Sequence, residues 1–464
     1  MKKIAIYEIN EVPWQVVDYY LEKRPKAYLA KFIGNSTNFI TETKDSGELH
    51  PWSTWPTLHR GVTNDTHNIR SLNQDLSAAD DYPPIWEILN TAGVTTGICG
   101  SLQSYPPRMN SSMSFHIPDT FSAGSETKPQ CYSPFQAFNL KQTGDNNAQA
   151  SGITATDIFS VFGLLRAGVK LSTLIKIGLH VANEFRNPLY KRRRSLLQPL
   201  VAFDVFKHCL KNQNQAQFVT FFSNHVAGIM HRYWKYSFPK EFDYSLESKT
   251  DYFHSESLMI AMDLFDSQLK ELDRWALRND YELVLCSSMG QEAIDRGEYV
   301  REAKISGLSQ INQALGYTGE IRQNLAMYPD VALKFPDKNA MVEYMQLIRK
   351  LVDSENKPLL AQAYEPTETT LNLRIGKSVA LNRDHTLVIE EQSFEMNELG
   401  VSLMDRDIGT AYHQPQGILI WRQDSSNAGA HAGRTVVDSR SVLPTLLEKF
   451  GIQPAEYMYP PIFK

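Results

Sequence analysis

One stretch of the chain reads Leu49-His-Pro-Trp-Ser-Thr-Trp-Pro-Thr-Leu-His-Arg-Gly-Val-Thr-Asn-Asp-Thr-His-Asn-Ile69. It places three hydroxyl side chains, Ser53, Thr54 and Thr57, between the histidines His50 and His59. Hydroxyls in such a position commonly cap the first backbone N–H groups of a helix. The alternative is chemical, because a hydroxyl activated by a base or a metal is a nucleophile, and either histidine would serve as a base or a phosphate contact.

Short apolar runs alternate with segments of helical spacing along most of the chain. The runs at 3–9, 94–98, 217–222 and 281–286 have the length and composition of buried parallel strands. Segments 14–32, 84–93 and 257–277 carry apolar residues at helical spacing. This alternation predicts an α/β fold with a doubly wound, mainly parallel sheet flanked by helices.

The pattern changes between about 292 and 400. Here the predicted strands are shorter and polar on one face, around a helix at 339–353. We expect a small α+β cap over 292–400, inserted into a core formed by 1–291 and 401–464. A helical insertion at about 150–215 is expected within that core.

The 49–69 stretch resembles the nucleophile loop of the alkaline phosphatase superfamily, in its type I phosphodiesterase and nucleotide pyrophosphatase branch. Arg60-Gly61 and His67-Asn68-Ile69 stand where that loop has Thr-Gly and His-Gly-Ile. Further segments resemble the branch in the same order, namely 2–14, 84–93, 104–107, 221–234, 287–290, 413–417 and 443–447. The resemblance implies an alkaline-phosphatase-like fold with two divalent metals at the carboxyl ends of the strands.

Carried over residue by residue, the resemblance implies that the first metal site has lost its ligands. Asn10 stands at the first-strand Asp, and Ser288 and Met289 stand at an Asp-His pair. These neutral groups would bind zinc poorly. Counting back from Gly61, the nucleophile position holds Pro51, whereas a small shift in alignment places Thr54 there. Thr54 or Thr57 is therefore the expected nucleophile, and Asn10, Asn224, His59 and Ser288 are expected to contact the substrate.

The second metal site keeps part of its ligand set. His231 and His413 match two ligand positions, and the position of the loop's Asp holds Ala227. His225 lies near the strand end where that Asp points, so three imidazoles with an open fourth position would form a single site for zinc or manganese. The alternative is that these histidines are hydrogen-bonded core residues. At the first site, Glu8 or Glu11 would compensate for the lost ligands only by turning inward, and no metal is expected there. Glu11 is a further acid–base candidate.

Size, charge and cysteine content narrow the class of protein. The chain has 464 residues and a net charge of −5, which gives no reason to expect nucleic-acid binding. Four scattered cysteines indicate reduced thiols rather than a disulfide framework. Without an apolar leader or a run of about 18 apolar residues, we expect a cytoplasmic protein.

A basic run, 191–194, follows apolar helical segments that also contain Arg166, Lys170 and Lys176. One interpretation is a peripheral contact of residues 154–194 with an anionic membrane or a lipid-linked substrate. The other is a solvated connection between two helices.

Three functions fit these patterns. The first is a phosphate or sulfate ester hydrolase or transferase that uses one metal or none. The first strand of this chain resembles that of proteins from bacterial surface-polysaccharide pathways. This resemblance implies a glycan or lipid-linked sugar ester as substrate. The second is a non-catalytic, metal-free binding protein, and the third is a metal-free glycan transferase that uses Glu8, Glu11 and a histidine as acid–base groups.

Overall fold

The structure is a computed structural model that describes residues 2–72, 74–107, 112–144, 163–213, 216–324, 326, 329–422 and 433–463. The chain forms two compact units. Unit 1 comprises Met1–Ile69, Asn73–Glu292 and Ala411–Lys464, and unit 2 comprises Arg70–Leu72 and Ala293–Thr410. Of the expected helical insertion, residues 150–162 and 214–215 lie outside the described residues.

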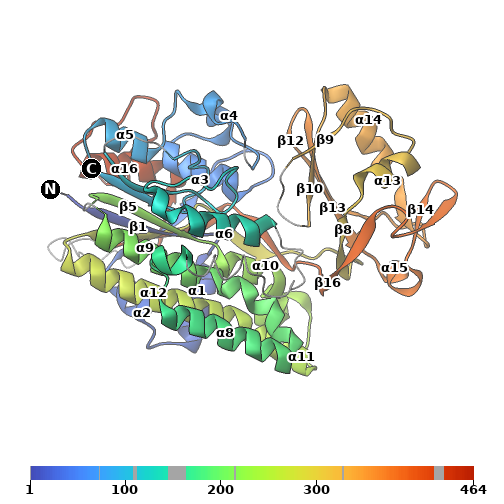
Figure 1. The fold of residues 1–464 in the computed structure, drawn as a ribbon, viewed down its shortest axis with the longest axis horizontal. Helices are drawn as coiled ribbons and strands as arrows, with labels where there is room; N and C mark the ends of the chain where they lie inside the picture. Colours follow the sequence, from blue (N-terminus) through green and yellow to red (C-terminus); the bar gives the residue numbers. More distant parts are fainter. Residues whose placement is uncertain are drawn as a thin grey trace. The chain divides into compact units, whose positions relative to one another are not determined.

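Unit 1 is built on an eight-stranded sheet in the order β19-β2-β18-β6-β1-β5-β3-β4 (Figure 1). In that order the strands span Thr435–Asp438, Thr37–Glu42, Gln416–Arg422, Glu282–Cys286, Ile4–Ile9, Phe218–Ser223, Thr96–Cys99 and Met113–Ile117. Strand β1 is parallel to β5 and β6, and β3 is parallel to β4 and β5, whereas β18 is antiparallel to β2 and β6. The predicted doubly wound, mainly parallel sheet is confirmed.

Successive residues of β1 face opposite sides of the sheet, where different helices cover them. Tyr7 donates a hydrogen bond to Gln268 on α12 (Ser257–Arg278), at 2.6 Å. Glu8 contacts His59 on α3 (Pro51–Arg60), at 2.8 Å. All six β1 residues are buried, as expected for a central parallel strand. The face toward α3 is completed by α5 (Ile85–Thr91) and α16 (Val442–Lys449), whose side chains join one apolar core.

The remaining helices of unit 1 differ from the predicted segments in one place. The single helix predicted over 14–32 is two helices, α1 (Trp14–Lys23) and α2 (Tyr28–Gly34). Pro25 explains the break, because a residue before proline disfavours helical backbone angles. The others are α4 (Asn64–His67), α6 (Ser133–Gly144), α8 (Leu171–Arg186), α9 (Gln198–Asn212), α10 (His225–Ser237) and α11 (Lys249–Ser255). No described helix is long and apolar enough to cross a membrane.

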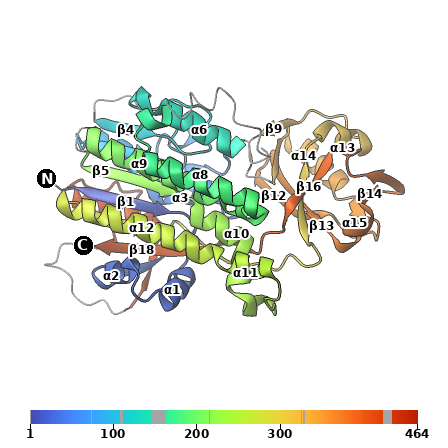
Figure 2. The same cartoon turned by 60° about the horizontal axis from the view of Figure 1, so that its bottom comes forward.

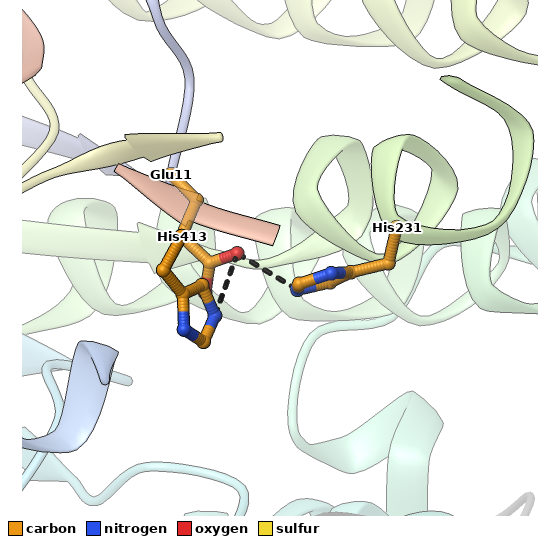
Figure 3. A group of neighbouring side chains, drawn as sticks. All are labelled: Glu11, His231 and His413. Atoms are coloured by element: carbon orange, nitrogen blue, oxygen red, sulfur yellow. Dashed lines mark ion pairs between the residues drawn. The ribbon is translucent and has the colours of Figure 1, made fainter. Parts of the chain in front are cut away.

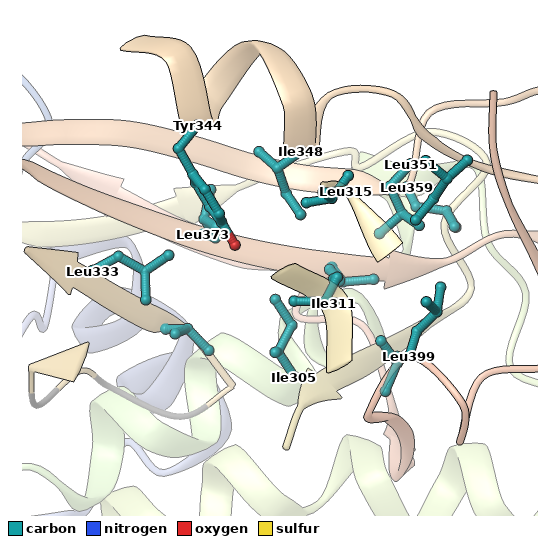
Figure 4. Close-up of a cluster of buried hydrophobic side chains, with 14 of the residues drawn as sticks. Ile305, Ile311, Leu315, Leu333, Tyr344, Ile348, Leu351, Leu359, Leu373 and Leu399 are labelled. Carbon is teal, nitrogen blue, oxygen red and sulfur yellow. The ribbon is translucent and has the colours of Figure 1, made fainter. Parts of the chain in front are cut away.

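Unit 2 is an α+β unit with its own apolar core (Figure 4). Its main sheet has the order β16-β8-β13-β10-β9, spanning Val401–Asp407, Arg301–Ile305, Thr370–Lys377, Val331–Lys334 and Arg322–Asn324, with β12 (Leu360–Thr367) paired to β13. A second sheet holds β11 (Leu351–Asp353), β14 (Thr386–Ile389) and β15 (Gln392–Glu395). Its helices are α13 (Leu308–Ala314), α14 (Lys338–Ile348) and α15 (Val379–Asp384).

The helix predicted at 339–353 was too long. It ends at Ile348, because Leu351–Asp353 pairs with β14, with Leu351 opposite Ile389. A run of apolar residues is compatible with either a helix or a buried strand, so pairing with a distant strand decides the outcome.

Candidate metal centre

Three side chains of unit 1 converge just beyond the carboxyl end of β1 (Figure 3). Oε2 of Glu11 lies 3.0 Å from Nε2 of His231 and 3.6 Å from Nε2 of His413. His231 comes from α10 and His413 from β17 (Ala411–Gln414), which pairs with β7 (Gly290–Ala293). The Glu11 and His413 side chains are 3% and 6% exposed, whereas His231 is 26% exposed and leaves the group open to solvent.

The backbone at Glu11 departs from the strand. Its φ of +58° lies in the left-handed region, which costs a non-glycine residue about 1 kcal/mol or more. Because of this turn, the carboxyl group of Glu11 does not follow the two-residue alternation of β1. The carboxyl group thereby reaches the two histidines.

Hydrogen bonds from neighbouring amides hold Glu11 in place. Asn10 donates from Nδ2 to Oε1 of Glu11 at 2.8 Å and to Oδ1 of Asn224 at 2.7 Å, and its own Oδ1 accepts from Nε1 of Trp55 at 2.8 Å. Gln291 donates from its side-chain amide to Oε2 of Glu11. Asn10 and Asn224, expected to orient substrate, are therefore engaged in positioning the carboxylate.

Backbone carbonyl groups fix the tautomers of both histidines. Nδ1 of His231 lies 3.0 Å from the oxygen of Ala411, and Nδ1 of His413 lies 2.5 Å from the oxygen of Leu49. A carbonyl oxygen only accepts hydrogen bonds, so each Nδ1 carries a proton. In the neutral ring, each Nε2 then presents a lone pair toward Glu11. The ligand atoms of all three residues lie within 4.8 Å of one another, so three acceptors face one another.

The pKa values match this arrangement. Burial would raise the pKa of Glu11, but the charges that His413 and His231 carry when protonated hold it well below 4.5. Burial lowers the pKa of the His231 imidazole below 6.5, although the nearby carboxylate of Glu11 opposes that shift. At neutral pH Glu11 is ionised and His231 is neutral, which are the states that metal ligands require.

His225, the third imidazole expected in the metal site, does not join this group. Its Nε2 lies 3.1 Å from the backbone oxygen of Ala261, and its Nδ1 lies 2.8 Å from Oγ of Ser223. Both ring nitrogens thus have hydrogen-bond partners, and no lone pair is left for a cation. Glu11 takes the place that the sequence assigned to His225.

Burial of His225 makes the stability of the chain depend on pH. The pKa of its imidazole is lowered from 6.5 to about 4 by desolvation. Between these values the unfolded chain binds a proton that the folded chain does not, so stability falls as pH drops from 6.5 to 4. We expect a loss of roughly 2 kcal/mol between pH 7 and pH 5 from this residue, measured as the free energy of urea unfolding.

The variant His225→Gln keeps a donor for the Ala261 oxygen and cannot titrate. It is expected to show a shallower fall in stability between pH 7 and pH 5. An unaltered slope in His225→Gln would contradict a neutral, buried His225.

Ser288, one of the positions expected to have lost a metal ligand, forms a buried hydroxyl pair with Thr54. Oγ1 of Thr54 and Oγ of Ser288 lie 2.8 Å apart, and both side chains are buried. Met289 is also fully buried. The structure therefore brings the candidate nucleophile Thr54 beside Ser288.

Two other candidates on α3 have partners away from the metal group. Thr57 donates to Asp45 at 2.7 Å and contacts His67 at 2.9 Å, so its hydroxyl group ties α3 to the loop at Asp45 and to α4. His59 contacts Glu8 at 2.8 Å within the face of the sheet that α3 covers. The expected roles of Thr57 as nucleophile and of His59 as substrate contact are not supported by this placement.

His50 lies next to the group. It is the N-cap residue of α3, its ring stacks on Trp52 at 4.2 Å between centroids, and it meets the ring of His413 edge-on at 5.3 Å.

The sequence did not identify two residues that hold Glu11 in place. Gln291 bonds to Glu11 directly, and Trp55 acts through Asn10. Gln291 directly follows the 287–290 segment, and that adjacency was the one available signal.

Known proteins resemble this chain in fold only. No protein-family model matches it, and no curated protein matches it by sequence. Murine ectonucleotide pyrophosphatase/phosphodiesterase 5 is 11% identical, with 99% of this chain and 97% of that chain covered and a TM-score of 0.46. Phosphonoacetate hydrolase from Sinorhizobium meliloti 1021, in complex with phosphonoformate, is 11% identical, with 95% and 94% covered and a TM-score of 0.42.

A mutant of TAB5 alkaline phosphatase with bound Mg is 8% identical, with 97% of this chain and 98% of that chain covered and a TM-score of 0.39. At such identities and TM-scores these likenesses say nothing about activity, and the proposal below rests on this chain's own side chains.

Proposed function

We propose that this chain binds one divalent metal through Glu11, His231 and His413 and hydrolyses or transfers a phosphate or sulfate ester. The observation that carries the proposal is the convergence of three acceptor atoms with both histidine tautomers fixed by backbone carbonyl groups. Such hydrogen bonds from the other ring nitrogen are typical of histidines that bind metals. Facing acceptors repel one another unless a cation or a proton lies between them.

The donor set fits the proposed metal. Two imidazole nitrogens and one carboxylate oxygen, with further positions open, form a set used for catalytic zinc. Nitrogen and oxygen donors also suit manganese. When bound, such an ion polarises the ester and lowers the pKa of a coordinated water. The 26% exposed His231 provides access from solvent.

The protein's own electrostatics would favour an anionic ester at this place. His413 bonds to the oxygen of Leu49, directly before the N-cap residue of the ten-residue helix α3. Asn224, which bonds to Asn10, is the N-cap residue of the 13-residue helix α10. Two helix N-termini, each with partial positive charge, therefore begin next to the carboxylate and its partners.

Thr54 is the proposed nucleophile, because it lies in the first turn of α3 and its hydroxyl group has a hydroxyl partner in Ser288. Ser288 accepts or donates the hydrogen bond that orients Oγ1 of Thr54. A glycan or lipid-linked sugar ester is proposed as substrate on the strength of the sequence resemblance. His50 then supplies an imidazole beside His413 for proton transfer.

The proposal is tested by metal content and turnover in one set of proteins. Purified wild type is stripped with a chelator, reloaded with zinc or manganese, and assayed on phosphodiester and sulfate ester substrates. We expect about one metal per chain and turnover that requires it. Thr54→Val is expected to keep the metal and to lower kcat at least about 1000-fold.

Thr57→Val is the matched control, a threonine on the same helix whose partner is Asp45. It should retain turnover in its folded fraction. A wild type that binds neither metal would overturn the proposed centre. A wild type that binds metal but turns over no ester would indicate that the chain is a metal-binding protein and not an enzyme.

A metal-free acid–base mechanism is the second candidate, and one observation favours it. The 3.0 Å distance between Oε2 of Glu11 and Nε2 of His231 is that of a direct hydrogen bond when His231 is protonated. Turnover that survives a chelator and is lost in Glu11→Gln would favour this candidate and count against the metal.

A further inference from the structure

Helix α8 packs against unit 1 through its polar side. Thr173 donates to Asp204 on α9 at 2.5 Å. Glu184 is buried and accepts from Nε of Arg194 at 2.7 Å. His180 lies 3.0 Å from the backbone oxygen of Tyr190. A helix on the surface of a globular protein normally directs polar residues outward, so this orientation is the reverse of the usual one.

The outward side of α8 is apolar. Its exposed large apolar side chains are Leu171 at 66%, Ile175 at 55%, Leu179 at 61%, Val181 at 36% and Phe185 at 88%. Residues 171, 175 and 179 follow the four-residue spacing of one helix face, and 185 lies about 40° from 171 in projection down the helix axis. Turning the view brings α8 to the front of the molecule, with its length uncovered by other described elements (Figure 2). An exposed apolar stripe of this length marks an interaction surface.

The charge around this stripe is positive. Residues 163–199 contain eight Lys and Arg and a single acid, Glu184, in a chain whose net charge is −5. Lys176 and Arg186 on α8 are exposed, as is Lys191 in the turn that follows. Glu184 is buried and paired with Arg194, so no acid is exposed beside the stripe among residues 163–199. Glu271 on α12 is exposed and pairs with Lys170 just before α8, but the exposed charged groups of α8 itself are basic. An apolar stripe with basic groups on its own helix complements an anionic lipid surface.

We propose that α8 lies in the interface of an anionic lipid bilayer and holds unit 1 on the membrane surface. Its apolar side chains enter the boundary between headgroups and acyl chains, and the basic side chains contact lipid phosphates. With 16 residues and an apolar face on one side only, α8 lies on the bilayer and does not span it. This surface is separate from the ester chemistry and does not depend on it.

Vesicle binding tests the proposal. The full chain is sedimented with vesicles of phosphatidylcholine containing 30% phosphatidylglycerol and, separately, with vesicles of phosphatidylcholine alone. We expect binding to the anionic vesicles that weakens as salt is raised. The double variant Lys176→Gln/Arg186→Gln is expected to bind roughly 25-fold more weakly, because each basic residue near an anionic surface contributes about five-fold.

Leu179→Ser removes one apolar side chain from the stripe and is expected to weaken binding by about ten-fold or more. Leu277→Ser is the matched control, since this leucine on α12 has a similar exposure of 58% and lies outside the stripe. Equal losses in both variants, or equal binding to neutral and anionic vesicles, would overturn the proposal. A third outcome would also overturn it: the wild type does not bind vesicles but forms dimers, and Phe185→Glu separates these dimers into monomers. The stripe would then bind a second copy of the chain.

Discussion

Glu11→Gln is expected to remove the metal from a chain that stays folded. The substitution keeps the size of the side chain but removes the charge, and it leaves only two imidazoles to hold a dication. Metal affinity should fall by more than the roughly 10–100-fold that follows loss of an outer partner of a ligand. Turnover of any ester that needs the metal should fall with it.

The measurement is a zinc titration followed by calorimetry, with metal content per folded chain determined in parallel. Metal present at 100 times its Kd stabilises the folded wild type by about 2.7 kcal/mol, and Glu11→Gln should lack this increment. Glu8→Gln is the control, because Glu8 is a buried carboxyl group on the same strand that contacts His59 instead. Zinc binding of wild-type affinity in Glu11→Gln would refute the assigned centre.

Trp55→Ala is expected to give the largest loss of stability among changes near the site. Trp55 is fully buried, packs edge-on against Phe222 at 5.7 Å between ring centroids, and donates to Asn10 at 2.8 Å. Deleting a buried tryptophan costs about 3–5 kcal/mol. Trp55→Phe keeps most of the packing and loses the hydrogen bond, so about 1–3 kcal/mol is expected.

Trp55→Phe is also expected to weaken zinc binding by about 10–100-fold, since Asn10 loses the donor that fixes its amide beside Glu11. Urea unfolding with and without zinc separates this effect from the loss of packing. Trp421→Phe is the matched control, because this tryptophan is equally buried and donates to Glu282 at 3.1 Å, away from the metal group. If both variants bind zinc alike, the hydrogen bond from Trp55 does not support the centre.

The fold was predictable from the sequence because its main signal is local. Buried parallel strands appear in a sequence as short apolar runs, and β1, β5 and β6 lie where those runs predicted them. Boundaries were less predictable. The end of α14 depends on pairing between Leu351 and Ile389, and such a contact between distant residues leaves no local pattern.

The candidate site was predictable in part. His231 and His413 were identified from motif spacing, but the third member was assigned to His225 because it follows β5 directly. The ring of His225 instead bonds to the backbone of α12, which spacing along the chain does not reveal. Glu11 was harder to identify, because strand alternation says nothing about a residue whose backbone leaves the strand with φ +58°.

The chain returns from unit 2 at Ala411, two residues before His413, and the carbonyl group of Ala411 holds His231. The segment where the chain re-enters unit 1 therefore supplies both the proposed ligand His413 and the carbonyl group that orients the proposed ligand His231. Side chains of a strand alternate between its two faces, so a single-residue insertion or deletion between 410 and 413 would present Tyr412 or Gln414 where His413 stands. The metal group therefore fixes the number of residues in the short step from Thr410 to His413.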